Sequence, residues 1–170
     1  MEHEHNSLTT RSRQRPFTNK NIPHSQIGVK PVPEVNAELF RRVYSLPDVS
    51  NRPTVISVPG ARAIWLNPDL ALEHPEAIVS GREFAHIHPD GSLHAALPPE
   101  LAREAIEKGW AEPHPLAQYL GMEGLVMLYT PQDMEELDVV FGLILDSYNF
   151  VTGRNLLPEN VFSNIASGEK

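Results

Sequence analysis

Apolar side chains recur every three or four positions in two parts of the chain, and each recurrence predicts an amphipathic helix. The first, residues 34–45, ends before Pro47, whose ring cannot continue a helix. The second follows Asp133 and ends before Gly153, which suits the left-handed position after a helix. Its apolar stripe consists of Met134, Leu137, Phe141, Ile144, Tyr148 and Val151. Such a stripe is typical of a helix that packs on a core, so we assign it no chemistry.

Shorter apolar segments predict the strands of a sheet. Residues 54–58 and 61–66 are rich in β-branched and aromatic side chains, and a Pro-Gly turn separates them. Residues 125–129 predict a short buried strand, and residues 98–109 predict a further helix that opens on two prolines. The pattern therefore predicts a single α+β domain, in which an antiparallel sheet packs against the long C-terminal helix.

Residues 81–97 predict a β-hairpin at the centre of this sheet. The tripeptide Pro89-Asp90-Gly91 suits a three-residue loop, and that loop length pairs His86 with His94. One face of the hairpin then carries Ala85, Ile87, Leu93, Ala95 and Leu97, and the other carries Phe84, His86, His88, Ser92 and His94. A two-residue loop would scatter the histidines over both faces, so the burial pattern favours the first register. Three imidazoles are therefore expected on one patch.

Three interpretations of this patch remain open. The histidines could simply form hydrogen bonds within the fold. They could instead bind a divalent metal ion through His86, His88 and His94, with His114 as a fourth ligand, because opposed Cβ atoms on a sheet lie only ~5 Å apart. In the third interpretation, one imidazole acts as a general base without a metal.

The third interpretation needs a pocket and a group that stabilises negative charge. Arg82 precedes the strand of His86, and we expect it on the same face, where it would stabilise a developing oxyanion. The side chains of Trp65, Trp110, His114 and Tyr129 are candidates for binding the substrate. The catalytic candidates are therefore His86, His88, His94 and Arg82.

Composition narrows the function classes. The chain has 170 residues with 14 Lys and Arg against 22 Asp and Glu, and this net charge of −8 disfavours binding to nucleic acid. No cysteine is present, which excludes disulfides, thiolate nucleophiles and Cys-ligated metals. No motif supports a dinucleotide-binding fold or a P-loop. No apolar run is long enough to span a bilayer, so we expect a cytoplasmic protein without membrane contact. The oligomeric state stays open.

The charge also suggests the domain limits. Residues 1–30 carry five Lys and Arg against two Glu, have no periodicity and hold few large apolar side chains, which predicts a flexible basic tail. We expect the domain over residues 31–153 and a second tail over residues 154–170. The histidines of the first tail, such as His3 and His5, are poor candidates for a preorganised site.

Several short motifs together resemble the luciferase domain of fungal luciferases and their bacterial relatives over about residues 59–148. They are Arg82-Glu83-Phe84-Ala85-His86-Ile87-His88, Ser92-Leu93-His94, Lys108-Gly109-Trp110, His114-Pro115-Leu116-Ala117 and Tyr129-Thr130-Pro131. The resemblance implies an oxidoreductase: fungal luciferases oxidise 3-hydroxyhispidin, a hydroxylated styryl-pyrone, with O2 and without a nucleotide or a flavin.

The resemblance thus favours an oxygenase-like enzyme that acts on a small aromatic or pyrone-like substrate with O2 as co-substrate. The cofactor would be either absent or a divalent metal ion held by the histidines. The alternative is a protein without catalytic activity that binds a small ligand or a metal at the same histidines.

Overall fold

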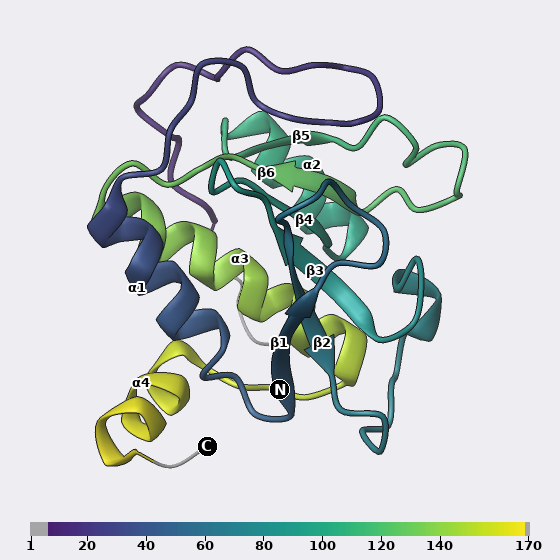
Figure 1. Ribbon diagram of the computed structural model, residues 1–170, viewed down its shortest axis with the longest axis vertical. Helices are drawn as coiled ribbons and strands as arrows, with labels where there is room; N and C mark the ends of the chain where they lie inside the picture. Colours follow the sequence, from purple (N-terminus) through teal and green to yellow (C-terminus); the bar gives the residue numbers. More distant parts are fainter. Residues whose placement is uncertain (1–6, 169–170) are drawn as a thin grey trace.

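The computed structural model describes residues 7–168, and within them six antiparallel strands form one sheet (Figure 1). The strands follow the order β1-β2-β3-β4-β6-β5 across the sheet. They are β1 (Val49–Pro53), β2 (Arg62–Leu66), β3 (Glu83–Ile87), β4 (Leu93–Ala96), β5 (Ala111–Pro113) and β6 (Leu125–Leu128). The helices are α1 (Pro33–Val43), α2 (Pro99–Glu107), α3 (Met134–Thr152) and α4 (Pro158–Ser167), with a 3₁₀ turn at Pro75–Ala77. The predicted α+β class is confirmed.

Helix α3 is the long helix that the apolar stripe predicts, and it packs on the central strands β3 and β4. Its N-terminus is capped by the Asp133 carboxylate, which accepts a 2.8 Å hydrogen bond from the Glu136 N–H. Its C-terminus ends at Gly153, whose φ of 75° is left-handed as predicted. The stripe is buried except for Met134, which is 45% exposed in the first turn.

One predicted strand is wrong. Residues 54–58 form a loop, and the strand beside β2 is instead β1. The loop is held by the carboxylate of Glu83, which accepts hydrogen bonds from the Thr54 hydroxyl at 2.7 Å and the Val55 N–H at 2.8 Å. The Thr54 hydroxyl oxygen in turn accepts the Ser57 N–H, so these backbone N–H groups bond to side chains and not to the backbone of a neighbouring strand.

A β-bulge at the start of β3 changes which residues face the histidines. Ile64 pairs with Ala85, but Trp65 pairs with Glu83, so the alternation of faces shifts by one residue at Phe84. The ring of Phe84 lies 6.0 Å from that of Tyr148 on α3, so its predicted place beside the histidines is wrong. Glu83 takes that place.

The two predicted tails have defined contacts where the structure describes them. Residues 7–30, which we call the N-terminal strap, run over β5 and β6 (Figure 1). Within the strap, Arg11 binds Glu136 at 2.6 Å, and the backbone oxygen of Thr9 accepts a 2.6 Å hydrogen bond from the Trp110 indole. At the other end of the chain, α4 buries Val161. His3 and His5, which the sequence analysis excludes as site residues, lie outside the described residues.

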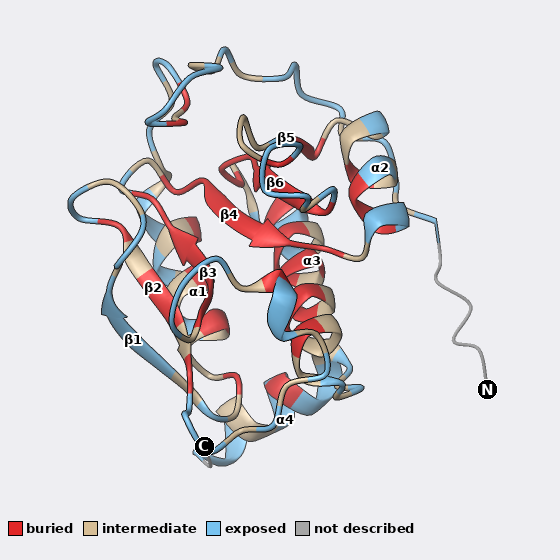
Figure 2. Ribbon diagram, turned by 90° about the vertical axis from the view of Figure 1, so that its right-hand side faces the viewer, coloured by how far each residue is buried: buried red, intermediate tan, exposed pale blue. Residues whose placement is uncertain are grey.

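Burial follows this arrangement (Figure 2). Strands β3, β4 and β6 are buried along their whole length, whereas β1, at the edge of the sheet, is largely exposed. No helix within residues 7–168 has both the length and the apolar character required to cross a bilayer.

Candidate functional site

The hairpin of β3 and β4 has the predicted register. His86 pairs with His94, Ile87 pairs with Leu93, and the His88 N–H donates to the Ser92 carbonyl at 2.8 Å. The ring of His94 therefore lies 5.0 Å from that of His86 and 4.4 Å from that of His88, centroid to centroid. All three side chains are buried. The predicted convergence of three imidazoles is present.

A fourth histidine, His24, reaches this cluster from the strap. Its ring stacks on that of His94 at 5.1 Å, and its Nδ1 lies 3.0 Å from His94 Nε2. The His24 side chain is completely buried. Sequence reasoning missed it because residues 1–30 have no periodicity. The available signal was charge: the basic residues of the strap match the acidic start of α3, where Arg13 binds Asp133 at 2.8 Å.

Four polar contacts join these rings into one row, which we call the histidine chain. Glu83 Oε1 lies 3.1 Å from His86 Nδ1, and His86 Nε2 lies 3.0 Å from His94 Nδ1. His94 Nε2 lies 3.0 Å from His24 Nδ1, and His24 Nε2 lies 3.0 Å from Glu112 Oε2. A carboxylate therefore stands at each end of a row of three imidazoles.

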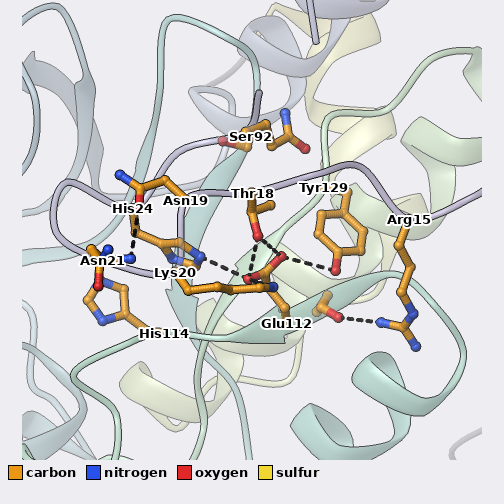
Figure 3. A network of polar contacts seen from close by, with 12 residues as sticks. Arg15, Thr18, Asn19, Lys20, Asn21, His24, Ser92, Glu112, His114 and Tyr129 are labelled. Atoms are coloured by element: carbon orange, nitrogen blue, oxygen red, sulfur yellow. Dashed lines mark hydrogen bonds and ion pairs between the residues drawn. The ribbon is translucent and has the colours of Figure 1, made fainter. Parts of the chain in front are cut away.

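The Glu112 end of the chain is held mainly by the strap (Figure 3). Lys20 Nζ lies 2.6 Å from the Glu112 carboxylate, and the hydroxyls of Thr18 and Tyr129 donate to it at 2.8 and 3.2 Å. The second carboxylate of the site is therefore buried with four donors, counting His24.

Two further histidines flank the chain and differ in how their rings are held. His88 Nδ1 lies 2.8 Å from the Ser92 hydroxyl, which itself donates to Asp90 at 2.6 Å. His114 Nδ1 accepts a 3.0 Å hydrogen bond from the Leu116 N–H, and its ring lies 4.5 Å from that of His94.

Burial determines the protonation of the site. It lowers the pKa of His94 far below the ordinary value, and it lowers the pKa of His88 and of His114 to about 4, in each case with help from neighbouring imidazoles. Burial acts to raise the pKa of Glu83 and Glu112, but their hydrogen bonds outweigh it, so the pKa of each is lowered. At neutral pH the site therefore combines neutral rings at His88, His94 and His114 with ionised carboxylates.

The imidazoles form one wall of a cavity of about 390 Å³. Its other walls are mostly apolar and come from the strap, from the loop after β1 and from the segment after β5. The lining residues are Ile22, Pro23, His24, Ile56, Ser57, Val58, Pro59, Val79, His86, His94, His114, Leu116, Leu120 and Leu125.

The other predicted site residues lie elsewhere. Arg82 donates to the backbone oxygens of Asn67 and Leu70, so the bulge turns it away from the histidines and the predicted oxyanion role is not supported. Trp110 is bound to the strap, and Trp65 lies under the Arg52 guanidinium at 5.0 Å. Neither tryptophan lines the cavity. Tyr129 does not line the cavity either, and its hydroxyl donates to Glu112.

Groups of histidines that could hold a metal ion occur twice among the described residues. One group is His86, His88 and His94, and the other is His24, His94 and His114. Within each group the ligand nitrogens all lie within 4.8 Å of one another. His94 belongs to both groups, through a different ring nitrogen in each, because its Nδ1 faces His86 and its Nε2 faces His24.

The fold and the site thus define the class: an α+β protein with a cluster of buried histidines on its sheet. The family model of the luciferase domain matches residues 81–146, so this part of the chain is similar to the luciferase-domain family. The matched segment contains the hairpin and most of α3 but not the strap.

Fungal relatives extend the likeness beyond that segment. A luciferase of Armillaria gallica is 31% identical over 165 residues, which cover 85% of this chain and 61% of that protein. Luciferases of Armillaria mellea and Neonothopanus nambi are each 35% identical over 105 residues, 54% of this chain and 39% of those proteins. The chain therefore spans less than two thirds of the length of these relatives. No solved structure matches it significantly.

Proposed function

We propose that the protein catalyses the oxidation, by O2, of a small enolisable aromatic or pyrone-like compound bound beside the histidine chain. The observation that carries this proposal is the cavity of about 390 Å³, in which an apolar enclosure meets four imidazoles. Its volume lies within the roughly 300–1,000 Å³ typical of small-ligand sites. The fungal luciferases among the relatives support a reaction of this class.

The chemistry follows from the charge state of the wall. A neutral imidazole of the cluster accepts the proton of the bound enol, and burial keeps such an imidazole unprotonated before the reaction. The substrate anion then transfers an electron pair to O2, so that a carbon–oxygen bond forms, the carbon is oxidised and O2 is reduced. The proton returns to the distal oxygen, and the product is a hydroperoxide of the substrate.

The anion needs a hydrogen-bond donor, and His114 supplies one in place of Arg82. Its Nδ1 accepts the Leu116 N–H, so the neutral ring carries its proton on Nε2. His114 lines the cavity. This N–H would stabilise the negative charge on the substrate oxygen as it develops.

The test is O2 uptake by the purified protein with a panel of hydroxypyrones and catechols. The wild type should consume one of them in air and not under argon, and His86→Ala should remove this activity. His74→Ala is the matched control, because His74 stacks on Phe150 away from the cavity and should leave the rate unchanged.

Substrate consumption that survives His86→Ala would refute a role for the cluster in the reaction. Binding of a pyrone without any oxygen uptake would favour the alternative, a protein that captures a small ligand without transforming it.

A further inference from the structure

With neutral rings, the histidine chain has one proton fewer than it has contacts. It joins five groups through four contacts, and each contact needs one hydrogen between its two heteroatoms. The two carboxylates supply none when they are ionised, and each neutral imidazole supplies a single N–H. Three such protons cannot fill four contacts, so in one contact two lone pairs face each other and leave room for a cation.

The ends of the chain limit where that bare contact lies. Glu83 and Glu112 accept hydrogen bonds and have none to give, so the N–H groups of His86 and His24 point to them. His94 then has one N–H for two acceptors, His86 Nε2 and His24 Nδ1. The bare contact is therefore either between His86 and His94 or between His94 and His24, and each lies in one of the two histidine groups.

The third histidine of each group separates these two arrangements. Ser92 donates its only hydrogen to Asp90, so its hydroxyl must accept from His88 Nδ1–H, and His88 Nε2 is left with a lone pair. This nitrogen is buried and has no hydrogen-bond partner among the described residues. In the other group, the Leu116 N–H occupies His114 Nδ1, so His114 Nε2 carries a hydrogen and not a lone pair.

We propose that His86 Nε2, His88 Nε2 and His94 Nδ1 bind one divalent transition-metal ion. At this place three lone pairs converge, whereas the group of His24 and His114 offers two. Ligands at about 2.0–2.1 Å in tetrahedral geometry lie about 3.4 Å apart, so the 3.0 Å contact between His86 and His94 would need to widen by only a few tenths of an ångström.

The far nitrogens of the three ligands support this assignment. His86 donates directly to Glu83, and His88 donates through Ser92 to Asp90. His94 donates through His24 to Glu112. Every ligand is thus oriented by a path that ends on a carboxylate, which is the usual outer arrangement of metal-bound histidine. The strap residue His24 holds a ligand in place and is not itself a ligand.

Three neutral imidazoles suit Zn²⁺, Fe²⁺, Ni²⁺ or Cu²⁺ better than Mg²⁺ or Ca²⁺. Two of the three ligands line the cavity, so an open coordination position would face a bound molecule. The inference rests on the hydrogen-bond pattern and does not depend on the oxidation proposed above.

The test is a titration of the full chain, stripped with a chelator, with Co²⁺ and then Zn²⁺, followed by calorimetry and by the visible absorption of Co²⁺. We expect one ion per chain, with the visible absorption bands of a Co²⁺ ion of low coordination number. His88→Ala should abolish this binding, and His114→Ala, the matched control in the same cluster, should retain it. Asp90→Asn should weaken binding by about 10- to 100-fold, because it removes the charge that orients His88.

Retention of the ion by His88→Ala with its loss in His114→Ala would overturn the assignment in favour of the other group. A wild type that binds neither ion stoichiometrically would overturn the metal site altogether and leave a proton in the bare contact. Far-ultraviolet circular dichroism checks that each variant is folded. If His88→Ala does not fold, the weaker metal binding expected of Asp90→Asn still tests the assignment. Because no substrate is present, these results are independent of the O2-uptake test.

Discussion

The hairpin and the strap bring histidines to the same site by different means. His86 and His94 are eight residues apart and meet because a short loop sets the register of two strands. His24 and His94 are 70 residues apart and meet because an irregular segment docks on the finished sheet. The difference teaches that the hairpin part of the site is set by local geometry, whereas the strap part depends on buried charge.

Removal of residues 1–30 should have the largest effect on stability. Glu136 would lose Arg11 and Arg13, and Glu112 would lose its strap donors, so two buried carboxylates would stand unpaired. Leaving one buried charge without its partner costs about 3–5 kcal/mol. Urea unfolding should therefore show a chain that is barely stable or unfolded. A strap-free protein with the midpoint of the wild type would mean that the strap contributes nothing to folding.

Within the hairpin, substitutions on its two faces should have opposite consequences. Ile87 is completely buried in the core under α3, so Ile87→Ala leaves a cavity there. We expect the free energy of unfolding to fall by about 2–5 kcal/mol. The variant molecules that are folded should still oxidise the substrate. His86→Ala should cost only about 0.5–3 kcal/mol, but should abolish the oxidation. Urea unfolding and O2 uptake should be measured on both variants. If both variants lost stability and activity together, the two faces of the hairpin would not have separate roles.

The loop of the hairpin offers a smaller test of its local geometry. Gly91 has a φ of +86°, and an added Cβ would meet Thr130 Cγ2 at 2.8 Å. Gly91→Ala should therefore destabilise the fold by about 1–2 kcal/mol or more. Gly142→Ala is the control, since nothing outside its own helix lies within 4 Å, and it should stabilise α3 by a little under about 1 kcal/mol. Thermal unfolding of both variants measures this contrast: the melting temperature should fall for Gly91→Ala and rise for Gly142→Ala.

The smallest expected effect concerns the exposed ion pair between Arg13 of the strap and Asp133 at the start of α3. The Glu136 N–H and Arg13 hold the pKa of Asp133 below its ordinary value of 3.8. The resulting stability is present above pH 3.8 and is lost as the pH falls through the lowered pKa. Asn also caps helices, so Asp133→Asn should cost at most about 1 kcal/mol at neutral pH, because Arg13 is half exposed. The difference from the wild type should vanish in acid, as measured by urea unfolding across pH.

The sequence predicted the elements whose signal is periodic. Helix α3, its cap region and Gly153 follow from an apolar stripe, and the hairpin register follows from loop length and alternation. The positions of Phe84 and Arg82 could not be predicted, because a single bulge against Trp65 reverses the alternation and leaves no mark in the pattern. The loop at residues 54–58 escaped prediction for a similar reason: β-branched side chains favour a strand, but a distant carboxylate binds its backbone.

The strap also sets the order in which the site is assembled during synthesis. It leaves the ribosome before the sheet does, yet His24 binds Glu112, 88 residues further on, and Arg11 binds Glu136, 125 residues further on. The strap is therefore translated before the sheet but docks after it, and a nascent chain that has already formed the hairpin still lacks the carboxylate that holds His24 against His94. Until most of the polypeptide has emerged, the cavity has no completed wall in which a small molecule could be held.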